Sequence, residues 1–211
     1  TARSFAALVA LDERIYVCGG QGSSELLMSV ESYKPGSSSW EELPPMFQRR
    51  SESAAAVIGR RFYVCGGLGQ GLVSLSSLER FDPGGNLWER LPPLSEGRSG
   101  ACAAVADGAL YVLGGSGGMR NLRSGERFLP NTSRWEPLPP MRQGRSCAAA
   151  AVVEGRVYIV GGFDGSRDLN TAECFDPATH SWLPLPPLAE RRSWTVASVI
   201  AGRLYICGGC A

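Results

Sequence analysis

Short apolar runs alternate with glycine- and proline-containing turns along the whole chain. One run covers residues 54–58, a turn begins at Gly59, and a second run covers residues 61–65. Runs of this length between turn residues are typical of β-strands that pair in an antiparallel sheet. The pattern therefore predicts an all-β protein built from many short strands.

The same pattern returns at a nearly constant period. Gly-Gly pairs begin at positions separated by 47, 48, 47 and 47 residues, namely Gly19, Gly66, Gly114, Gly161 and Gly208. A tyrosine stands three residues before each pair, at Tyr16, Tyr63, Tyr111, Tyr158 and Tyr205. Self-similarity at a fixed period indicates a repeat architecture.

The second half of each unit predicts two further strands. A glutamate stands two residues before an aromatic ring, in the pairs Glu31 and Tyr33, Glu79 and Phe81, Glu126 and Phe128, and Glu173 and Phe175. A tryptophan follows at Trp40, Trp88, Trp135 and Trp182, and each unit ends at Pro-Pro. Proline cannot donate a hydrogen bond to a ladder, so the fourth strand ends there.

Four strands per unit at this period predict blades arranged radially around a channel, the β-propeller architecture. The repeats are expected at about residues 1–47, 48–95, 96–142 and 143–189, with a half repeat at 190–211. All of them are assigned to a single propeller domain, residues 1–211.

These motifs resemble the kelch repeat, in which Gly-Gly follows a tyrosine and precedes Glu-x-Tyr/Phe, Trp and Pro-Pro. The resemblance spans essentially the whole chain and implies a kelch-type β-propeller. Kelch domains of the adaptor type usually have six blades, about 280 residues at this period. We therefore expect either a fragment of a larger domain or an incomplete blade that pairs with another chain, including self-association.

Positions repeated in every unit are assigned to the scaffold, because they cannot encode one asymmetric binding site. An Arg-Ser pair starts at Arg3, Arg50, Arg98, Arg145 and Arg192. We expect the arginine to pair with the glutamate of the third strand, the serine to bond a backbone group of the neighbouring blade, and the Gly-Gly pair to allow close backbone approach. The four tryptophans are assigned to the scaffold as well.

Two positions vary completely between units and are the candidate binding residues. The residue after Arg-Ser is Phe5, Glu52, Gly100, Cys147 or Trp194, and the loop after Gly-Gly begins with Gln21, Leu68, Ser116, Phe163 or Cys210. Variable loops on a rigid scaffold usually carry recognition. In kelch adaptors both positions lie on the partner-binding face. Phe5, Phe163 and Trp194 are the expected aromatic anchors, with Arg120, Arg123 and Arg167 as polar contacts.

Charge and chemistry narrow the function further. The formal net charge of +1 does not favour nucleic acid or an anionic membrane as a partner. His180 is the single histidine, which argues against a metal site, a cofactor site or a Ser-His-Asp triad. The seven cysteines are expected to be reduced thiols, with Cys18, Cys65 and Cys207 in the core of a cytoplasmic protein.

The expected function is recognition of a protein or a short acidic or mixed peptide at the propeller mouth, not catalysis. The kelch resemblance implies attachment to a BTB domain and a cullin ubiquitin ligase through segments outside this chain. An actin-binding cytoskeletal scaffold is the alternative, and no residue separates the two. A propeller enzyme would need clustered ligands or several acids at the axis, and the sequence offers too few.

Overall fold

A computed structural model describes residues 1–210 and contains eighteen strands and one short 3₁₀ helix. The first sheet contains β1 (Ala7–Leu11), β2 (Arg14–Cys18), β3 (Val30–Tyr33) and β4 (Glu41–Leu43), and the second contains β5 (Ala54–Ile58), β6 (Arg61–Cys65), β7 (Leu78–Asp82) and β8 (Leu87–Leu91). The helix η1 (Gln70–Leu72) precedes β7. The bounds of β5 and β6 are the predicted ones.

The remaining repeats have the same order. The third sheet contains β9 (Cys102–Ala106), β10 (Ala109–Leu113), β11 (Gly125–Leu129) and β12 (Arg134–Pro137), and the fourth contains β13 (Ala149–Val153), β14 (Arg156–Val160), β15 (Ala172–Asp176) and β16 (Ser181–Leu185). β17 (Val196–Ile200) and β18 (Arg203–Cys207) form a two-stranded hairpin. Every strand pairs in antiparallel fashion with its neighbour in sequence. The predicted all-β kelch-type β-propeller, with four complete repeats and a half repeat, is confirmed.

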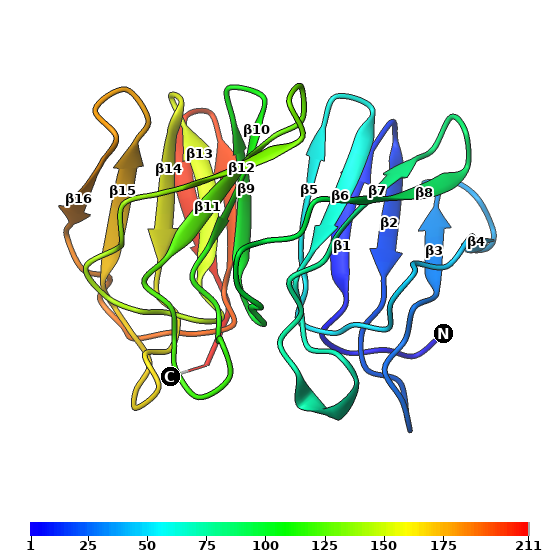
Figure 1. Ribbon diagram of the computed structural model, residues 1–211, viewed down its shortest axis with the longest axis horizontal. Coiled ribbons are helices and arrows are strands. Elements are labelled where there is room, and N and C mark those ends of the chain that lie inside the picture. Colours follow the sequence, from blue (N-terminus) through cyan, green and yellow to red (C-terminus); the bar gives the residue numbers. More distant parts are fainter. Residues whose placement is uncertain (211) are drawn as a thin grey trace. The chain divides into compact units, whose positions relative to one another are not determined.

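The chain divides into two compact units, one from Thr1 to Ser99 and one that begins at Gly100. The first unit holds the sheets β1–β4 and β5–β8, and the second holds β9–β12, β13–β16 and the β17–β18 hairpin. In each unit the loops that follow the Gly-Gly pairs project from the same end of the strands (Figure 1). The predicted binding residues lie in these loops or directly before the first strand of a sheet.

Aromatic rings fill the space between the two sheets of the first unit. The Tyr16 ring on β2 lies 5.0 Å from the Phe62 ring on β6, measured between centroids. Phe62 also contacts Phe81 at 5.1 Å and Trp88 at 5.4 Å. Tyr16, Phe62, Phe81 and Trp88 are all buried. The repeated tyrosine therefore packs against the next blade.

The Gly-Gly pairs lie where neighbouring repeats come closest. The backbone at Gly66 has φ +63°, and a Cβ there would lie 2.5 Å from the carbonyl oxygen of Arg98. The N–H of Gly67 donates to that same oxygen at 2.9 Å. Equivalent bonds run from Gly20 to Arg50, from Gly115 to Arg145 and from Gly162 to Arg192. The predicted close approach is confirmed in the four complete repeats, since a side chain at the first glycine there would collide with a backbone oxygen, whereas a Cβ at Gly208 would meet nothing within 4 Å.

The half repeat differs in burial from the complete ones. Tyr205 on β18 is 43% exposed, whereas the equivalent Tyr63 is 2% exposed. Burial raises the pKa of the Cys18 thiol to about 12, and Cys65 is also buried. Cys207 is exposed, so its predicted place in the core is wrong. The reason is that Cys18 is covered by Phe62 and Val64 of the next sheet, whereas no further sheet within residues 1–210 covers β18.

Candidate functional site

The repeated arginine is the centre of a buried polar network in each complete repeat. The Arg50 side chain is fully buried and forms an ion pair with Glu79, which is also buried. Its Nη1 donates to the carbonyl of Gly66 at 2.7 Å, and its Nη2 donates to the Ser77 hydroxyl at 2.9 Å. The second carboxylate oxygen of Glu79 accepts the N–H of Phe47 at 2.7 Å. This network links β7 to the segment that enters the second repeat.

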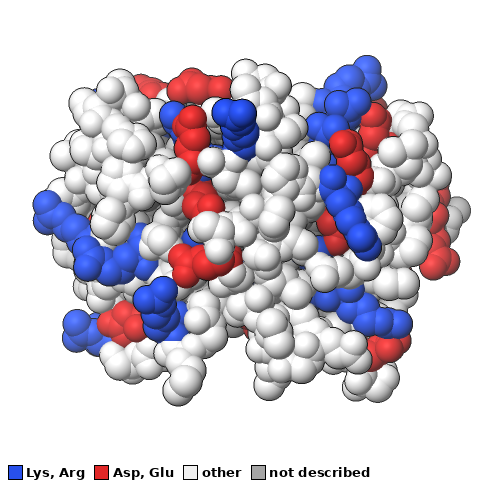
Figure 2. Space-filling model, viewed as in Figure 1, with Lys and Arg blue, Asp and Glu red and all other residues white. Residues whose placement is uncertain are grey.

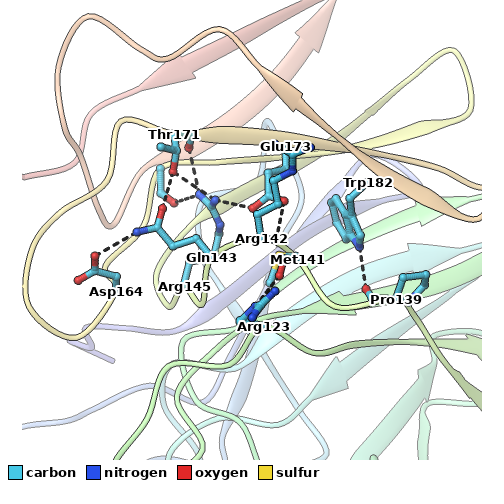
Figure 3. Close-up of polar contacts among 11 residues, drawn as sticks. Arg123, Pro139, Met141, Arg142, Gln143, Arg145, Asp164, Thr171, Glu173 and Trp182 are labelled. Carbon is cyan, nitrogen blue, oxygen red and sulfur yellow. Dashed lines mark hydrogen bonds and ion pairs between the residues drawn. The ribbon is translucent and has the colours of Figure 1, made fainter.

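Figure 3 shows the same network in the fourth repeat. Arg145 donates to Glu173 at 2.9 Å, to the Gly161 carbonyl at 2.7 Å and to the Thr171 carbonyl at 3.0 Å. The N–H of Arg142 completes the coordination of the Glu173 carboxylate at 2.8 Å. Arg145 thus contacts the third-strand glutamate of its own repeat, as the spacing predicted.

The other arginines vary with their surroundings. Arg3 forms an ion pair with Glu31 at 2.7 Å, and the Glu31 side chain is 15% exposed. Arg98 is buried, and its Nη2 contacts Glu96 at 3.3 Å. Arg192 contacts Glu190 at 3.0 Å and no third-strand glutamate within residues 1–210. The predicted Arg–Glu pairing is thus confirmed for Arg3, Arg50 and Arg145, whereas Arg192 lacks the strand that would supply it.

The repeated serine does not play its predicted part. In four repeats its backbone exchanges two hydrogen bonds with the first residue after Gly-Gly, in the pairs Ser4 and Gln21, Ser51 and Leu68, Ser146 and Phe163, and Ser193 and Cys210. Both members of each pair belong to the same repeat. The serine therefore extends the hairpin of the first two strands, and the expected bond to a neighbouring blade is formed by the second glycine instead.

The tryptophans link neighbouring blades by a bond that the sequence did not predict. The indole Nε1 of Trp88 donates to the carbonyl of Pro44 at 2.8 Å, and Trp182 donates to Pro139 at 2.8 Å. Each acceptor lies at the end of the preceding repeat (Figure 3). Trp40 on the first repeat is 48% exposed and stacks on Tyr33. A buried indole N–H needs a hydrogen-bond acceptor. The Pro-Pro motif supplies that acceptor to the tryptophan of the following repeat.

The variable residue after Arg-Ser has the same unusual backbone in every repeat. The φ angles are 53° at Phe5, 52° at Glu52, 59° at Gly100, 53° at Cys147 and 57° at Trp194. Within the units, the N–H of each residue donates to the carbonyl of its equivalent one repeat earlier, from Glu52 to Phe5, from Cys147 to Gly100 and from Trp194 to Cys147. Gly100, which favours this left-handed region, was the signal from which the conformation could have been predicted.

The side chains at this position lie on the surface of the first strands to different extents. Phe5 is 51% exposed and Trp194 is 43% exposed, and Glu52 and Cys147 are half-buried. Gly100 is buried, and a Cβ there would lie 3.0 Å from the Cys147 sulfur. Four of the five candidates are thus displayed, and Gly100 contributes only backbone.

A groove lies beside these residues in the first unit. It has a volume of about 290 Å³ and is lined by the loops after the first two Gly-Gly pairs, including Gln21 and Leu68. Leu72 at the end of η1 lines this groove and is 81% exposed. The groove thus contains two candidate residues, Gln21 and Leu68, beside the apolar side chain of Leu72, which the sequence analysis did not single out. The signal that could have indicated it is the one extra residue of the second repeat, which falls in the loop that carries Leu72.

The three candidate arginines have different environments. Arg123 donates from Nε to the carbonyl of Met141 at 2.6 Å (Figure 3), so at least this part of the side chain belongs to the scaffold. Arg167 forms an ion pair with Asp164 at 3.6 Å. Hydrogen bonds from the Ser166 backbone and hydroxyl, with help from Arg167, lower the pKa of Asp164 to about 2. Arg120 is exposed beside Met119 in the loop after the third Gly-Gly.

Charges of the two signs are interspersed on the face of the protein that Figure 2 shows. Lysine and arginine atoms alternate with aspartate and glutamate atoms on the face shown in Figure 2. Within the candidate face, burial raises the pKa of Glu52. Among residues 1–210 no group of three or more His, Cys, Asp or Glu side chains could hold a metal ion, and no helix there could cross a membrane.

Comparisons with known proteins agree with this architecture. A structure described as "Structure of YjhT" superposes with a TM-score of 0.89 and 18% sequence identity, over 98% of this chain and 77% of that chain. Identity at this level shows a shared fold alone. No curated protein matches the chain. The kelch motif matches residues 2–47, 49–95, 97–142 and 144–189, the four complete repeats described above, so the chain belongs to the kelch-repeat family.

Proposed function

We propose that this protein is a binding module without catalytic activity, and that it recognises a protein or peptide through the variable residues and the loops after Gly-Gly. One observation carries the proposal. The backbone at Phe5, Glu52, Gly100, Cys147 and Trp194 is the same in all five repeats, whereas the side chain is different in each. The scaffold therefore does not specify these side chains, and their identity is available for recognition.

The cost of the backbone conformation strengthens this argument. A left-handed φ costs a non-glycine residue on the order of 1–2 kcal/mol, and glycine avoids most of this cost. Gly100 demonstrates that glycine fits the position. The other repeats nevertheless have Phe5, Glu52, Cys147 and Trp194 there. Side chains that are retained against local stability are expected to serve a function.

The first unit indicates the chemistry of a ligand. Phe5 and Glu52 are neighbours, because the N–H of Glu52 donates to the carbonyl of Phe5 at 2.9 Å. The groove with Leu72 on its rim lies in the same unit. An apolar side chain fits this groove, and a basic or hydrogen-bond-donating group fits Glu52. Of the acidic or mixed peptides that the sequence led us to expect, these groups favour a mixed one.

These residues do not indicate which cellular role the binding would serve. The kelch resemblance implies substrate recognition for a cullin ubiquitin ligase, with actin binding as the alternative. Neither role is favoured by a contact within residues 1–210, so the proposal is restricted to protein binding, for which Trp194 and Phe5 are the proposed anchors.

The proposal is tested by selecting binders from a random peptide library on the intact protein. Trp194→Ala is expected to lower the affinity for the selected peptides by about 30-fold, the loss typical of a buried interface hot spot. The melting temperature should change by only a few degrees, because the Trp194 side chain is 43% exposed and is not part of the buried core. Isothermal titration calorimetry and thermal unfolding provide the two measurements.

Trp40→Ala is the matched control, because Trp40 is a similarly exposed tryptophan outside the variable positions. It should leave peptide affinity unchanged. Equal losses for both variants, or a collapse of stability on Trp194→Ala, would contradict the proposed recognition surface.

A further inference from the structure

The groove of the first unit is lined by two loops that main-chain bonds hold in place. The loop between β6 and β7 projects beyond the ends of these strands (Figure 1), and within it the N–H of Gly69 donates to the carbonyl of Val73 at 2.8 Å. In the loop of the first repeat, the N–H of Gly22 donates to the carbonyl of Glu25 at 2.9 Å. Side chains on an ordered backbone lose less entropy when a ligand binds.

Leu72 and Leu68 give this groove an apolar part. The Leu72 side chain is 81% exposed, and its backbone has φ +60°, directly after Gly71 with φ +73°. A left-handed conformation is unfavourable for leucine, and an exposed apolar side chain gains nothing from folding. An apolar side chain of a ligand that covers Leu72 would remove this surface from water.

The groove also contains a guanidinium that can bind a carboxylate. Arg49 donates to the carbonyl of Leu26 at 2.8 Å, which holds its side chain at the groove. Its ion pair with Glu25, at 3.1 Å, joins side chains that are 39% and 60% exposed. An exposed pair contributes little to stability, so a ligand carboxylate can replace Glu25 at small cost. The planar guanidinium suits a carboxylate, because it can donate two parallel hydrogen bonds.

A carboxylate without a counter-charge follows on the same segment. Ser51 and Leu68 exchange two backbone hydrogen bonds, at 3.1 and 2.7 Å, so Glu52 comes directly after the residue opposite Leu68. Glu52 forms no ion pair within residues 1–210, and burial raises the pKa of its carboxyl group. A half-buried carboxylate that has lost solvation without gaining a partner favours a cationic ligand.

The spacing of these groups determines the order of a matching ligand. Arg49 and Glu52 are three residues apart, so their Cα atoms are separated by about 11 Å at most. Leu68 is opposite Ser51, which lies between them in the chain. An extended peptide advances by about 3.3 Å per residue. A peptide with an acidic and a basic residue about three positions apart, and an apolar residue between them, therefore matches all three groups.

We propose that this groove binds an extended segment of a partner protein in which an acidic and a basic residue flank an apolar one. The acidic side chain binds Arg49, the apolar side chain packs on Leu68 and Leu72, and the basic side chain pairs with Glu52. This assignment rests on the function proposed above, because Leu68 and Glu52 are variable positions, and it specifies the ligand of the first unit.

Two fluorescently labelled peptides serve as probes, one for each chain direction: Gly-Ser-Glu-Leu-Ser-Arg-Ser-Gly and Gly-Ser-Arg-Leu-Ser-Glu-Ser-Gly. At least one should bind the intact chain saturably in fluorescence polarisation. Glutamine in place of either charged residue of that peptide should lower its affinity about 10-fold, because a charge-assisted hydrogen bond is lost. Serine in place of its leucine should have a similar effect. These comparisons change only the peptide, so they need no protein variant to fold.

Double-mutant cycles assign each contact. Arg49→Gln should abolish the effect of neutralising the peptide glutamate, and Glu52→Gln should abolish the effect of neutralising the peptide arginine. The mismatched combinations should be additive. Leu72→Ser should lower affinity about 10-fold. Leu87→Ser is the matched control and should leave affinity unchanged, since Leu87 is 55% exposed and does not line the groove.

Failure of both probes to bind, or equal binding of the parent and charge-neutral peptides, would overturn the proposal. Peptides from the random library that lose affinity on Trp194→Ala without coupling to Arg49 or Glu52 would also overturn it, while leaving the wider recognition surface in place. The predicted couplings in a probe that Trp194→Ala does not affect would support the groove and remove Trp194 from the recognition surface.

Discussion

The repeated arginine illustrates how one residue stabilises a repeat. Arg50 gathers a carboxylate, a carbonyl and a hydroxyl from separate segments of its repeat, and no part of its side chain reaches solvent. Removing one member of a buried ion pair leaves the other charge without compensation. The same arrangement around Arg145 indicates that the second and fourth repeats both depend on this contact.

Arg50→Met should therefore lower the free energy of unfolding by about 3–5 kcal/mol, because Glu79 stays buried without its partner. Urea denaturation measures the loss. Arg60→Met is the matched control, since Arg60 is 87% exposed in its ion pair with Asp12. Its loss should be within about 1 kcal/mol. Similar losses for the two variants would mean that the buried pair contributes no more than a surface pair.

Glu52 is expected to destabilise the fold at neutral pH. Burial raises the pKa of its carboxyl group, so the folded protein holds the proton more tightly than the unfolded chain. Below the ordinary value of 4.5 the group is neutral in both states, and stability falls as pH rises through the raised pKa. Glu52→Gln should therefore raise the melting temperature near neutral pH, with the gain disappearing in acid.

Thermal unfolding across this pH range measures the effect, and Glu42→Gln on an exposed strand residue is the control. A gain from Glu52→Gln that persists unchanged in acid would show that burial of the charge is not the cause. Glu52→Gln should also weaken the binding of a basic ligand, since it removes the proposed counter-charge.

At the scale of the elements, coupling between repeats is carried largely by main chain. The second glycine of each complete repeat and the variable residues Glu52, Cys147 and Trp194 form backbone bonds from one repeat to another. Backbone bonds do not depend on side-chain identity, so the variable residues that we propose for recognition can also help to join the repeats. The left-handed backbone at these positions accompanies both the bond between repeats and the placement of the side chain at the surface.

Two glycines at opposite ends of β14 allow the cost of backbone strain to be distinguished from the cost of a steric collision. Gly155 has φ +74° with open space where a Cβ would be, whereas a Cβ on Gly161, with φ +66°, would lie 2.5 Å from the Arg192 carbonyl oxygen. Gly155→Ala should cost about 1 kcal/mol from backbone strain alone. Gly161→Ala should cost about 3 kcal/mol or more, because backbone must also move.

Chemical denaturation of both variants measures the difference. Equal losses would mean that the contact between repeats yields to an added methyl group, and the close-approach argument would fail for this pair.

At the scale of the whole molecule, each repeat is stabilised by its neighbours. The Tyr16 ring is covered by Phe62 of the next sheet, and the Trp88 indole finds its acceptor on the preceding one. Tyr205 and Trp40 lack the corresponding cover and are exposed. Repeat proteins of this kind depend on nearest-neighbour interfaces, so the repeats at the ends of the described chain carry the open surfaces.

Much of the fold could be predicted because local chemistry repeats at a constant period. Strand positions, turns and the Arg–Glu pairing follow from spacing alone, as the bounds of β5 and β6 and the pair of Arg145 with Glu173 demonstrate. The role of the serine was predicted wrongly, because its side chain was assumed to act where its backbone does. The core position of Cys207 was also wrong, since burial depends on a neighbouring strand rather than on register.

The sequence by itself determined the period, the strand order and the division between repeated and variable positions, because glycine, proline and buried arginine each satisfy a local requirement that can be read from spacing. Only the tertiary structure decided which groups meet across repeats. It revealed the left-handed backbone at Phe5 and Trp194 and the indole bonds to proline carbonyls. These features depend on where distant segments are brought together, which spacing along the chain does not specify.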